Sequence, residues 1–278
     1  MDVGIYMFPT DYAIRVDELA VEAEQRGFES LWLPEHTHIP VSRKTPFPGG
    51  GDLPQEYSHT LDPFVGLAAA AVRTETIKLS TGICLLAQRD PIITAKEVAS
   101  VDLLSNGRFV FGLGGGWNVE EMNHHGTEYD TRFQKLEERV AAMKAIWTRE
   151  EAEFHGELVD FEPIWSWPKP VQKPHPPIFL GGATGYTRQR VVDFCDGWLP
   201  IGFSVGAVLQ GIEDLHRRAE EAERDRSTLS VSVFGARPER EVLDAYENGG
   251  VDRAILMVKP EGRDQVLQRL DSYRELIG

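Results

Sequence analysis

Two residues that follow one apolar run could do acid–base chemistry. The run Ser30–Leu33 leads directly to Glu35 and His36, and His38 comes two residues later. A histidine at the end of a strand can act as a general base, donate a hydrogen bond to a bound group or be purely structural. Its position directly after Glu35 favours a function. We therefore predict Glu35 and His36 as the catalytic residues.

A metal site is the second interpretation of the same residues. The pair His36 and His38 forms an H-x-H pattern, which closes the first strand of the barrel in metal-dependent hydrolases. Here the pattern closes the second strand candidate, and all other histidines fall in loops or helices. These are His59, His124, His125, His155, His175 and His216. The sequence therefore disfavours a metal.

A glycine-rich stretch, RFVFGLGGGWNVEE, spans residues 108–121. Gly112 and Gly114 fit the dinucleotide-binding pattern G-x-G-x-x-G, but Trp117 stands where the third glycine should be. An indole there would block the close packing of helix on strand that the glycine allows. We interpret the stretch as a barrel strand whose carboxyl end lacks side chains, so that a flat ring can lie on its backbone.

A second glycine-rich turn and one lysine could also bind or react. Residues 181–185, GGATG, follow an apolar run and precede a predicted helix, an arrangement that can bind phosphate through backbone N–H groups. The alternative is a tight turn without a ligand. Lys259 closes the last apolar run, where a Schiff-base lysine could stand, but no second strand-end lysine or tyrosine would tune it. A solvated lysine is favoured.

The composition limits the class of protein. The 278 residues are 41% hydrophobic and 26% charged, with a net charge of −15, which argues against a nucleic-acid or anionic-membrane partner. No apolar run reaches about 18 residues and the amino terminus does not resemble a signal peptide, so a cytoplasmic protein is expected. Cys84 and Cys195 lie in apolar surroundings and are predicted to be buried reduced thiols.

Short apolar runs alternate with longer amphipathic ones along the chain, as in βα units. The predicted strands are Val3–Phe8, Ser30–Leu33, Ile77–Leu86, Arg108–Leu113, Pro177–Leu180, Gly197–Ile201, Leu229–Phe234 and Arg253–Val258. The predicted helices are Ile14–Arg26, Pro63–Arg73, Ile92–Leu104, Phe133–Thr148, Thr187–Phe194, Ala207–Asp225, Arg240–Asn248 and Arg263–Leu276. The count predicts a single α/β domain, a TIM (β/α)8 barrel over residues 1–278, with a doubly wound open sheet as the alternative.

Two insertions interrupt this alternation. Residues 37–61 follow the second strand, and residues 150–176 separate the helix after the fourth strand from the fifth strand. The second insertion is too rich in proline for a helix and too apolar for a disordered linker. We expect an ordered excursion over the barrel mouth, since long loops in compact domains are usually lids or binding loops. Asn123, His124 and His125 are expected to cap or flank a short helix after Trp117.

These residues together resemble the bacterial luciferase-like monooxygenase superfamily, and most closely its coenzyme F420-dependent branch. The resemblance covers nearly the whole chain. Its strongest pieces are LWLPEH, STGICLLAQRDPIITAKEVASVDLLSNGRFVFGLGGGWNVEEMNHHG, and FHGELVDFEPIWSWPKPVQKPHPPIFLGGATG followed by DGWLP. The order and spacing of these pieces are more specific than any one of them.

The resemblance implies a TIM barrel that holds a flavin or deazaflavin ring at the mouth. It implies that Glu35 and His36 lie near the ring and the substrate. The implied cofactor-binding residues are Thr81, Gly82 and Ile83 at a non-prolyl cis peptide, Gly115 and Trp117 at the fourth strand end, and Gly181, Gly182 and Ala183 at the phosphate turn. It also implies a homodimer and a small-molecule substrate.

One departure and three functional hypotheses remain. F420-dependent sugar-phosphate dehydrogenases carry an acid where this chain has Trp117, so an apolar substrate is favoured over a sugar phosphate. The leading hypothesis is hydride transfer between F420 and an organic substrate, with Arg43, Lys44, Arg188 and Arg190 as candidates to meet the acidic tail of F420. The alternatives are an FMN-dependent monooxygenase supplied by a separate reductase, and a non-catalytic flavin-binding barrel. A sugar-phosphate isomerase or aldolase barrel would not explain the bare glycines.

Overall fold

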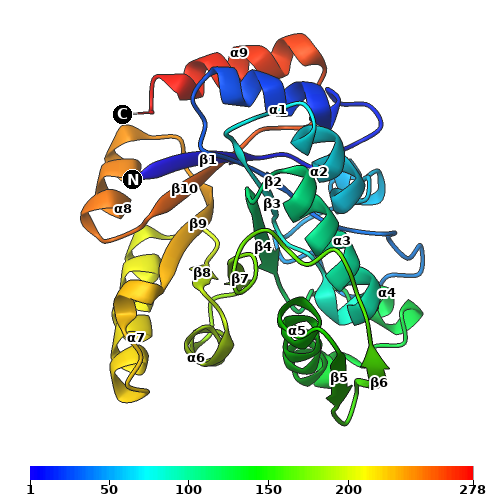
Figure 1. Ribbon diagram of the computed structural model, residues 1–278. Coiled ribbons are helices and arrows are strands. Elements are labelled where there is room, and N and C mark those ends of the chain that lie inside the picture. Colours follow the sequence, from blue (N-terminus) through cyan, green and yellow to red (C-terminus); the bar gives the residue numbers. More distant parts are fainter. Residues whose placement is uncertain (278) are drawn as a thin grey trace.

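The computed structural model describes residues 1–277, and these contain a closed barrel of parallel strands surrounded by helices (Figure 1). The strands around the barrel are β1 Asp2–Tyr6, β10 Arg253–Met257, β9 Ser230–Ala236, β8 Gly197–Leu199, β7 Ile178–Gly181, β4 Phe109–Leu113, β3 Lys78–Thr81 and β2 Ser30–Leu33. Strand β1 pairs with both β10 and β2, so the sheet has no open edge. The predicted TIM barrel is confirmed, and the open-sheet alternative is excluded.

Helices link successive strands and cover the outside of the barrel. They are α1 Val16–Gln25, α2 Pro63–Ala71, α3 Pro91–Leu104, α4 Val119–His124, α5 Arg132–Thr148, α6 Gly185–Phe194, α7 Val205–Glu221, α8 Arg240–Asn248 and α9 Arg263–Arg274. Local chemistry fixes several starts: Asp62 and Asp90 accept hydrogen bonds from the first turns of α2 and α3, and a proline follows each. No helix within residues 1–277 is long and apolar enough to cross a membrane.

The third strand is shorter than the predicted Ile77–Leu86. It ends at Thr81, and the peptide bond between the following two residues, Gly82 and Ile83, is cis. Beyond it the chain stays beside β4, because the Cys84 N–H donates to the Gly112 carbonyl (2.8 Å) and the Gly114 N–H donates to the Cys84 carbonyl (3.0 Å). The apolar pattern continued past the strand because these residues remain buried.

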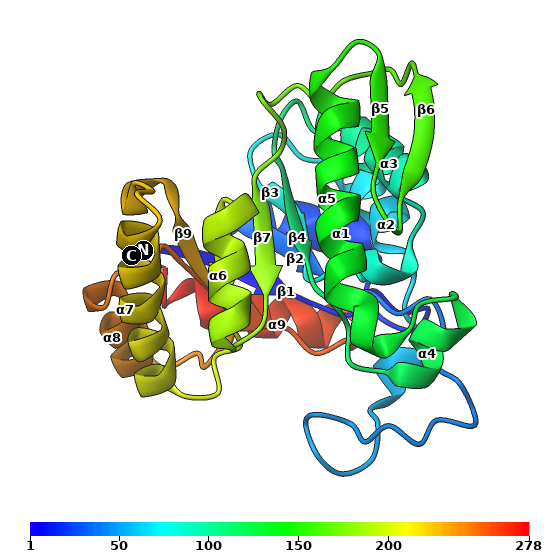
Figure 2. The same cartoon turned by 90° about the horizontal axis from the view of Figure 1, so that it is seen from below.

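The second insertion does not cover the mouth, contrary to our expectation. It forms a hairpin, β5 Ala152–His155 with β6 Asp160–Ile164, which flanks α5 on the side away from the mouth (Figure 2). It then crosses the amino-terminal end of the barrel, where Gln172 donates to the carbonyl of Phe109, the first residue of β4 (2.7 Å). The reason is topological: the segment joins a helix to a strand, and only strand-to-helix loops reach the mouth.

Two apolar layers stabilise the barrel. The larger lies between the strands and the surrounding helices. The smaller fills the barrel interior and consists of Trp32, Val110, Phe179, Leu199 and Ile255, with Tyr6, Ile83 and Phe234 packed on it and only partly buried. Cys84 and Cys195 are free and buried, as predicted.

Candidate active site

The centre of the candidate site is a buried pair formed by His36 and Glu121. Nδ1 of His36 lies 2.8 Å from Oε2 of Glu121, and the exposed fractions of the two residues are 7% and 0%. His36 comes from the loop after β2, and Glu121 comes from α4, after β4. The structure thus joins two loops at the carboxyl ends of the strands, where TIM-barrel active sites lie. Sequence reasoning missed Glu121 as a partner.

Helix α4 holds Glu121 in place. Asn118 caps the helix, and its side-chain oxygen accepts a hydrogen bond from the Glu121 N–H (3.4 Å). The other carboxylate oxygen of Glu121, Oε1, and the side-chain nitrogen of Asn118 are both buried. Neither atom has a hydrogen-bond partner among the described residues. Unpaired buried polar atoms beside a histidine at the mouth are suited to a ligand or an ordered water.

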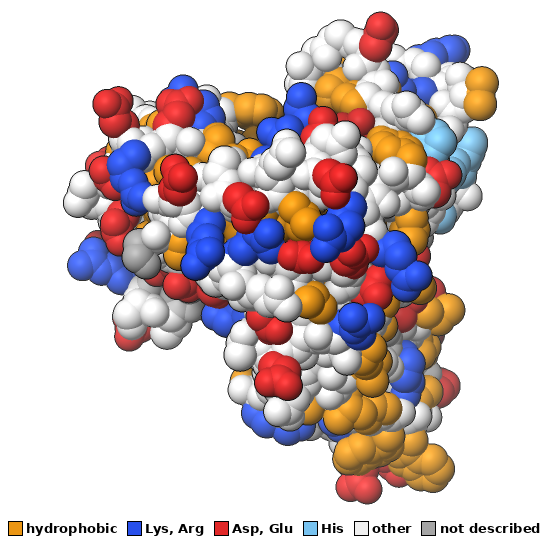
Figure 3. Space-filling model, turned by 90° about the horizontal axis from the view of Figure 1, so that it is seen from above, with side chains coloured by type: hydrophobic (Ala, Val, Ile, Leu, Met, Phe, Trp, Pro, Cys, Tyr) orange, Lys and Arg blue, Asp and Glu red, His pale blue; other side chains and the backbone are white. Residues whose placement is uncertain are grey.

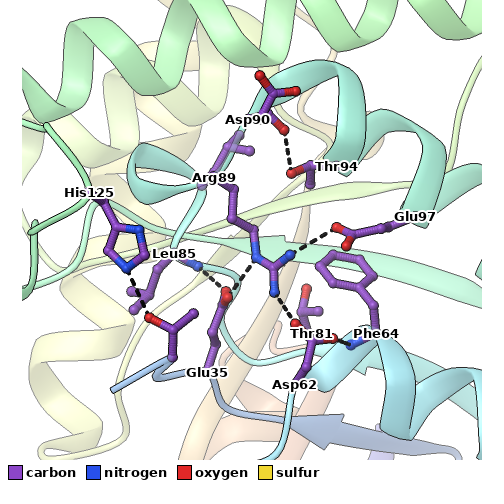
Figure 4. A network of polar contacts seen from close by, with 12 residues as sticks. Glu35, Asp62, Phe64, Thr81, Leu85, Arg89, Asp90, Thr94, Glu97 and His125 are labelled. Atoms are coloured by element: carbon purple, nitrogen blue, oxygen red, sulfur yellow. Dashed lines mark hydrogen bonds and ion pairs between the residues drawn. The ribbon is translucent and has the colours of Figure 1, made fainter. Parts of the chain in front are cut away.

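Glu35 is buried beside His36 but faces a different network (Figure 4). Its carboxylate accepts hydrogen bonds from the Leu85 N–H (2.7 Å) and from Nε of Arg89 (2.6 Å). The same guanidinium also pairs with Glu97 (2.9 Å) and with Asp62. The network ties the end of β2 to the segment after the cis peptide and to the starts of α2 and α3. Burial raises the pKa of Glu35, and Arg89 and the Leu85 N–H oppose the rise.

An aromatic wall stands beside the buried pair; it consists of Phe47, Tyr57 and Trp117. The His36 ring lies 5.1 Å from that of Tyr57 and 6.0 Å from that of Trp117, centroid to centroid. The centroid of the Phe47 ring lies 5.2 Å from that of Tyr57 and 6.0 Å from that of Trp117. Burial raises the pKa of Tyr57 to about 12, so its hydroxyl is un-ionised near neutral pH. The first insertion supplies Phe47 and Tyr57, so this segment does lie at the mouth (Figure 2).

The first insertion is fastened to α4 by polar contacts as well. Glu120 accepts hydrogen bonds from the Lys44 N–H (2.9 Å) and the Thr45 hydroxyl (2.6 Å). The rings of His38 and His124 stack, with Nε2 of one 2.9 Å from Nδ1 of the other. The wall is therefore held against the helix that carries Glu121. His125, the C-cap of α4, completes the short helix expected after Trp117.

The glycines of β4 are required by packing against β3 rather than by a ligand. A Cβ on Gly112 would lie 2.1 Å from the Thr81 carbonyl oxygen, and one on Gly114 would lie 2.2 Å from Cδ1 of Ile83. A Cβ on Gly115 would lie 3.0 Å from the ring of Phe133. The bare strand end, which we interpreted as space for a flat ring, is thus filled largely by the protein itself. Thr81 and Ile83 crowd the positions of Gly112 and Gly114, and Phe133 of α5 crowds that of Gly115.

The surface left for a flat ring lies on the partly exposed side chains of Tyr6, Ile83 and Phe234, which we term the floor. They sit near the carboxyl ends of β1, β3 and β9 and pack on the interior layer. The rings of Tyr6 and Phe234 stack at 4.0 Å between centroids. The site combines an apolar floor, an aromatic wall and the buried pair of His36 and Glu121. This combination fits a planar aromatic cofactor, since such sites combine apolar walls with few polar groups.

The predicted phosphate turn is ordered at the start of α6. The Thr184 hydroxyl accepts from the Thr187 N–H (3.1 Å), and the Gly182 carbonyl accepts from the indole of Trp198 (2.7 Å). Gly182 has φ +132°, and a Cβ there would lie 2.8 Å from Oγ1 of Thr187, so glycine is required. Ala183 is exposed on the turn. The turn can present backbone N–H groups to an anion.

The remaining candidates are placed as follows. Among the described residues, no group of three or more His, Cys, Asp or Glu side chains is arranged to hold a metal. Lys259 is exposed. Arg188 is paired with Asp214 and Arg190 with Glu137, whereas Arg43 lies over the ring of Trp117 at 5.7 Å. Lys44, beside Arg43, is exposed at the rim.

The fold and this site define a TIM-barrel protein with a candidate active site at the carboxyl ends of the strands, and sequence comparison gives the family. The chain belongs to the luciferase-like monooxygenase family, whose model matches residues 9–276. It is 44% identical over 203 residues to the uncharacterized protein Rv0953c of Mycobacterium tuberculosis, with 72% of each chain covered. It is 32% identical over 154 residues to the FMNH2-dependent dimethylsulfone monooxygenase of Pseudomonas putida, covering 54% of this chain and 42% of that one.

Solved structures share the fold at low sequence identity. The monooxygenase RslO1 from Streptomyces bottropensis matches with a TM-score of 0.81 and 21% identity, covering 99% of this chain and 98% of that one. The coenzyme F420-dependent tetrahydromethanopterin reductase from Methanopyrus kandleri matches with a TM-score of 0.77 and 15% identity, with the same coverage. The chain is thus a member of the luciferase-like monooxygenase family. One of its relatives is named for FMNH2, and one protein that shares the fold is named for coenzyme F420.

Proposed function

We propose that this chain is an F420-dependent oxidoreductase that moves a hydride between the cofactor and an organic substrate. The observation that carries the proposal is the buried pair of His36 and Glu121 beside the aromatic wall. The deazaflavin would supply the redox chemistry when bound. The chain would supply a dry, shaped surface and one site of proton exchange.

Each part of the mouth has a separate task in this proposal. The floor would support the ring, and Thr81 and Gly82, at the end of β3, would position Ile83 within the floor. Gly181, Gly182 and Ala183 would bind the phosphate through backbone N–H groups at the start of α6. Trp117 would exclude water from the substrate side.

His36 would exchange the proton, and Glu35 would hold the loop. Each carboxylate oxygen of Glu35 already accepts a hydrogen bond from the protein. We therefore assign Glu35 a positioning role in this arrangement, in place of the catalytic role that the sequence indicated. Arg43 and Lys44, at the rim, would meet the acidic tail of F420.

An FMN-dependent monooxygenase is the second candidate, because a relative at 32% identity carries that name. In that case a separate reductase would deliver reduced flavin. The same turn and floor serve both cofactors, so binding experiments must decide. Oxygen consumption with reduced FMN but not with reduced F420 would select this candidate.

The turn offers a test that does not disturb the fold. Ala183 is exposed, and an acid beside a helix amino terminus is tolerated or favourable for folding. Ala183→Glu should repel a phosphate and weaken F420 binding roughly tenfold or more, which corresponds to about 1.4 kcal/mol. Fluorescence titration with F420, and in parallel with FMN, measures this.

Ala183→Gln is the matched control, because it has nearly the same size without the charge. It should bind within roughly threefold of the unsubstituted chain. Equal weakening by both variants would reject the phosphate turn, and binding of neither cofactor to the unsubstituted chain would reject the proposed function.

We also propose a homodimer formed through the outer faces of α2 and α3. Large apolar side chains are exposed there although a water-facing helix surface is normally polar. They are Val65 and Val72 at α2 and Ile92, Ile93, Leu103 and Leu104 on α3. In the view from above, hydrophobic side chains, drawn in orange, gather down the right-hand side of the molecule (Figure 3). A second copy of this chain would cover them.

A further inference from the structure

The two carboxylates near His36 differ in what they can still bind. The two carboxylate oxygens of Glu35 each accept a hydrogen bond from the protein, one from the Leu85 N–H and one from Arg89. Glu121 contacts His36 through Oε2, and its Oε1 has no hydrogen-bond partner among residues 1–277. Glu121 is therefore the carboxylate coupled to the histidine, although Glu35 is its sequence neighbour.

The contact bears on which imidazole nitrogen carries the proton. With Glu121 ionised, its carboxylate only accepts hydrogen bonds, and at 2.8 Å from Oε2 the Nδ1 atom of His36 is then the donor. Neutral imidazole has one N–H and one acceptor nitrogen, and a proton held on Nδ1 leaves Nε2 as the acceptor. Nε2 makes no hydrogen bond to any other described residue, and its ring adjoins Tyr57 and Trp117.

We propose that Glu121 is a positioning residue that keeps the Nδ1 proton of His36 in place, so that Nε2 alone exchanges a proton with the bound ligand. Orientation of a histidine by a buried carboxylate is a general device for this purpose. The use of Nε2 by a ligand rests on the proposed function, whereas the tautomer does not.

Histidine nitrogen NMR tests the proposal without cofactor or turnover. The protein contains eight histidines, and the His36 signals are those lost in His36→Gln. At high pH the unsubstituted protein should show His36 with a protonated Nδ1 and a bare Nε2. In Glu121→Gln the acceptor-only carboxylate is replaced by an amide that can either accept from Nδ1 or donate to it, so the share of the Nδ1–H form should fall and that of the Nε2–H form should rise.

Glu120→Gln is the matched control, because Glu120 adjoins Glu121 on α4 and contacts Thr45 instead of His36. It should leave the His36 tautomer unchanged. The proposal is overturned if the unsubstituted protein holds the high-pH proton on Nε2, or if Glu121→Gln leaves the ratio of the two His36 tautomers unchanged. The first of these measurements needs no variant of Glu121, so it decides even if Glu121→Gln does not fold. A correct tautomer together with no cofactor binding would reject the proposed function alone.

Discussion

Gly112 and Gly114 show how much a single residue determines at this mouth. The two have similar sequence contexts, but their neighbours differ in rigidity. An added Cβ would meet the backbone oxygen of Thr81 in one case and the mobile end of the Ile83 side chain in the other. Backbone cannot move aside without breaking β3, whereas an isoleucine can change rotamer.

We therefore expect the two alanine variants to fail in different ways. Gly112→Ala should lower the free energy of unfolding by about 1–3 kcal/mol, as measured by urea denaturation. Gly114→Ala should cost less stability but should weaken F420 or FMN binding several-fold, because Ile83 forms part of the floor. Equal loss of stability in both variants would contradict this explanation.

At the scale of elements, charged clamps close the barrel where the strands begin. Glu29, just before β2, pairs with Arg253 at the start of β10 (2.5 Å) and with Lys78 at the start of β3 (2.8 Å). Burial alone would raise the pKa of Glu29, but these two partners lower it to about 2. A depressed carboxyl pKa contributes stability above the ordinary value of 4.5, and this stability is lost as the pH falls towards 2.

Glu29→Gln should thus lower the free energy of unfolding by about 2–3 kcal/mol at pH 7. The difference from the unsubstituted protein should shrink as the pH falls from 4.5 to 2. Glu18→Gln is the control, since Glu18 pairs with Arg263 on the surface and should change stability by less than about 1 kcal/mol. A constant difference across this pH range would show that the clamp does not act through its charge.

At the scale of the molecule, the proposed homodimer rests on the exposed apolar face on α2 and α3. If a second copy covers it, the protein should elute with twice the chain mass of 31.2 kDa in light scattering. The double substitution Val65→Glu with Ile93→Glu should give the monomer, because charges would be buried without partners. The control is Val41→Glu, because Val41 is a fully exposed residue of the first insertion; this variant should remain dimeric. A monomer before substitution would reject the proposed interface.

The amino-acid sequence by itself determined the barrel and most of its elements. Alternating apolar runs and capping signals such as Asp62–Pro63 are local, so each strand and helix could be placed from its own residues. The resemblance further indicated the cis peptide, and the structure has one between Gly82 and Ile83. The hairpin β5–β6 was missed because its strands have only four and five residues, few of them buried, so no apolar run marks them.

Only the tertiary structure decided which residues meet at the mouth. Glu121 lies 85 positions after His36, and no local pattern links them. The reason why Gly112 is glycine lies in the backbone of a neighbouring strand. The side of the barrel on which the second insertion lies follows from the direction of its flanking helix and strand. Contacts between distant segments depend on barrel closure, which one-dimensional spacing does not contain.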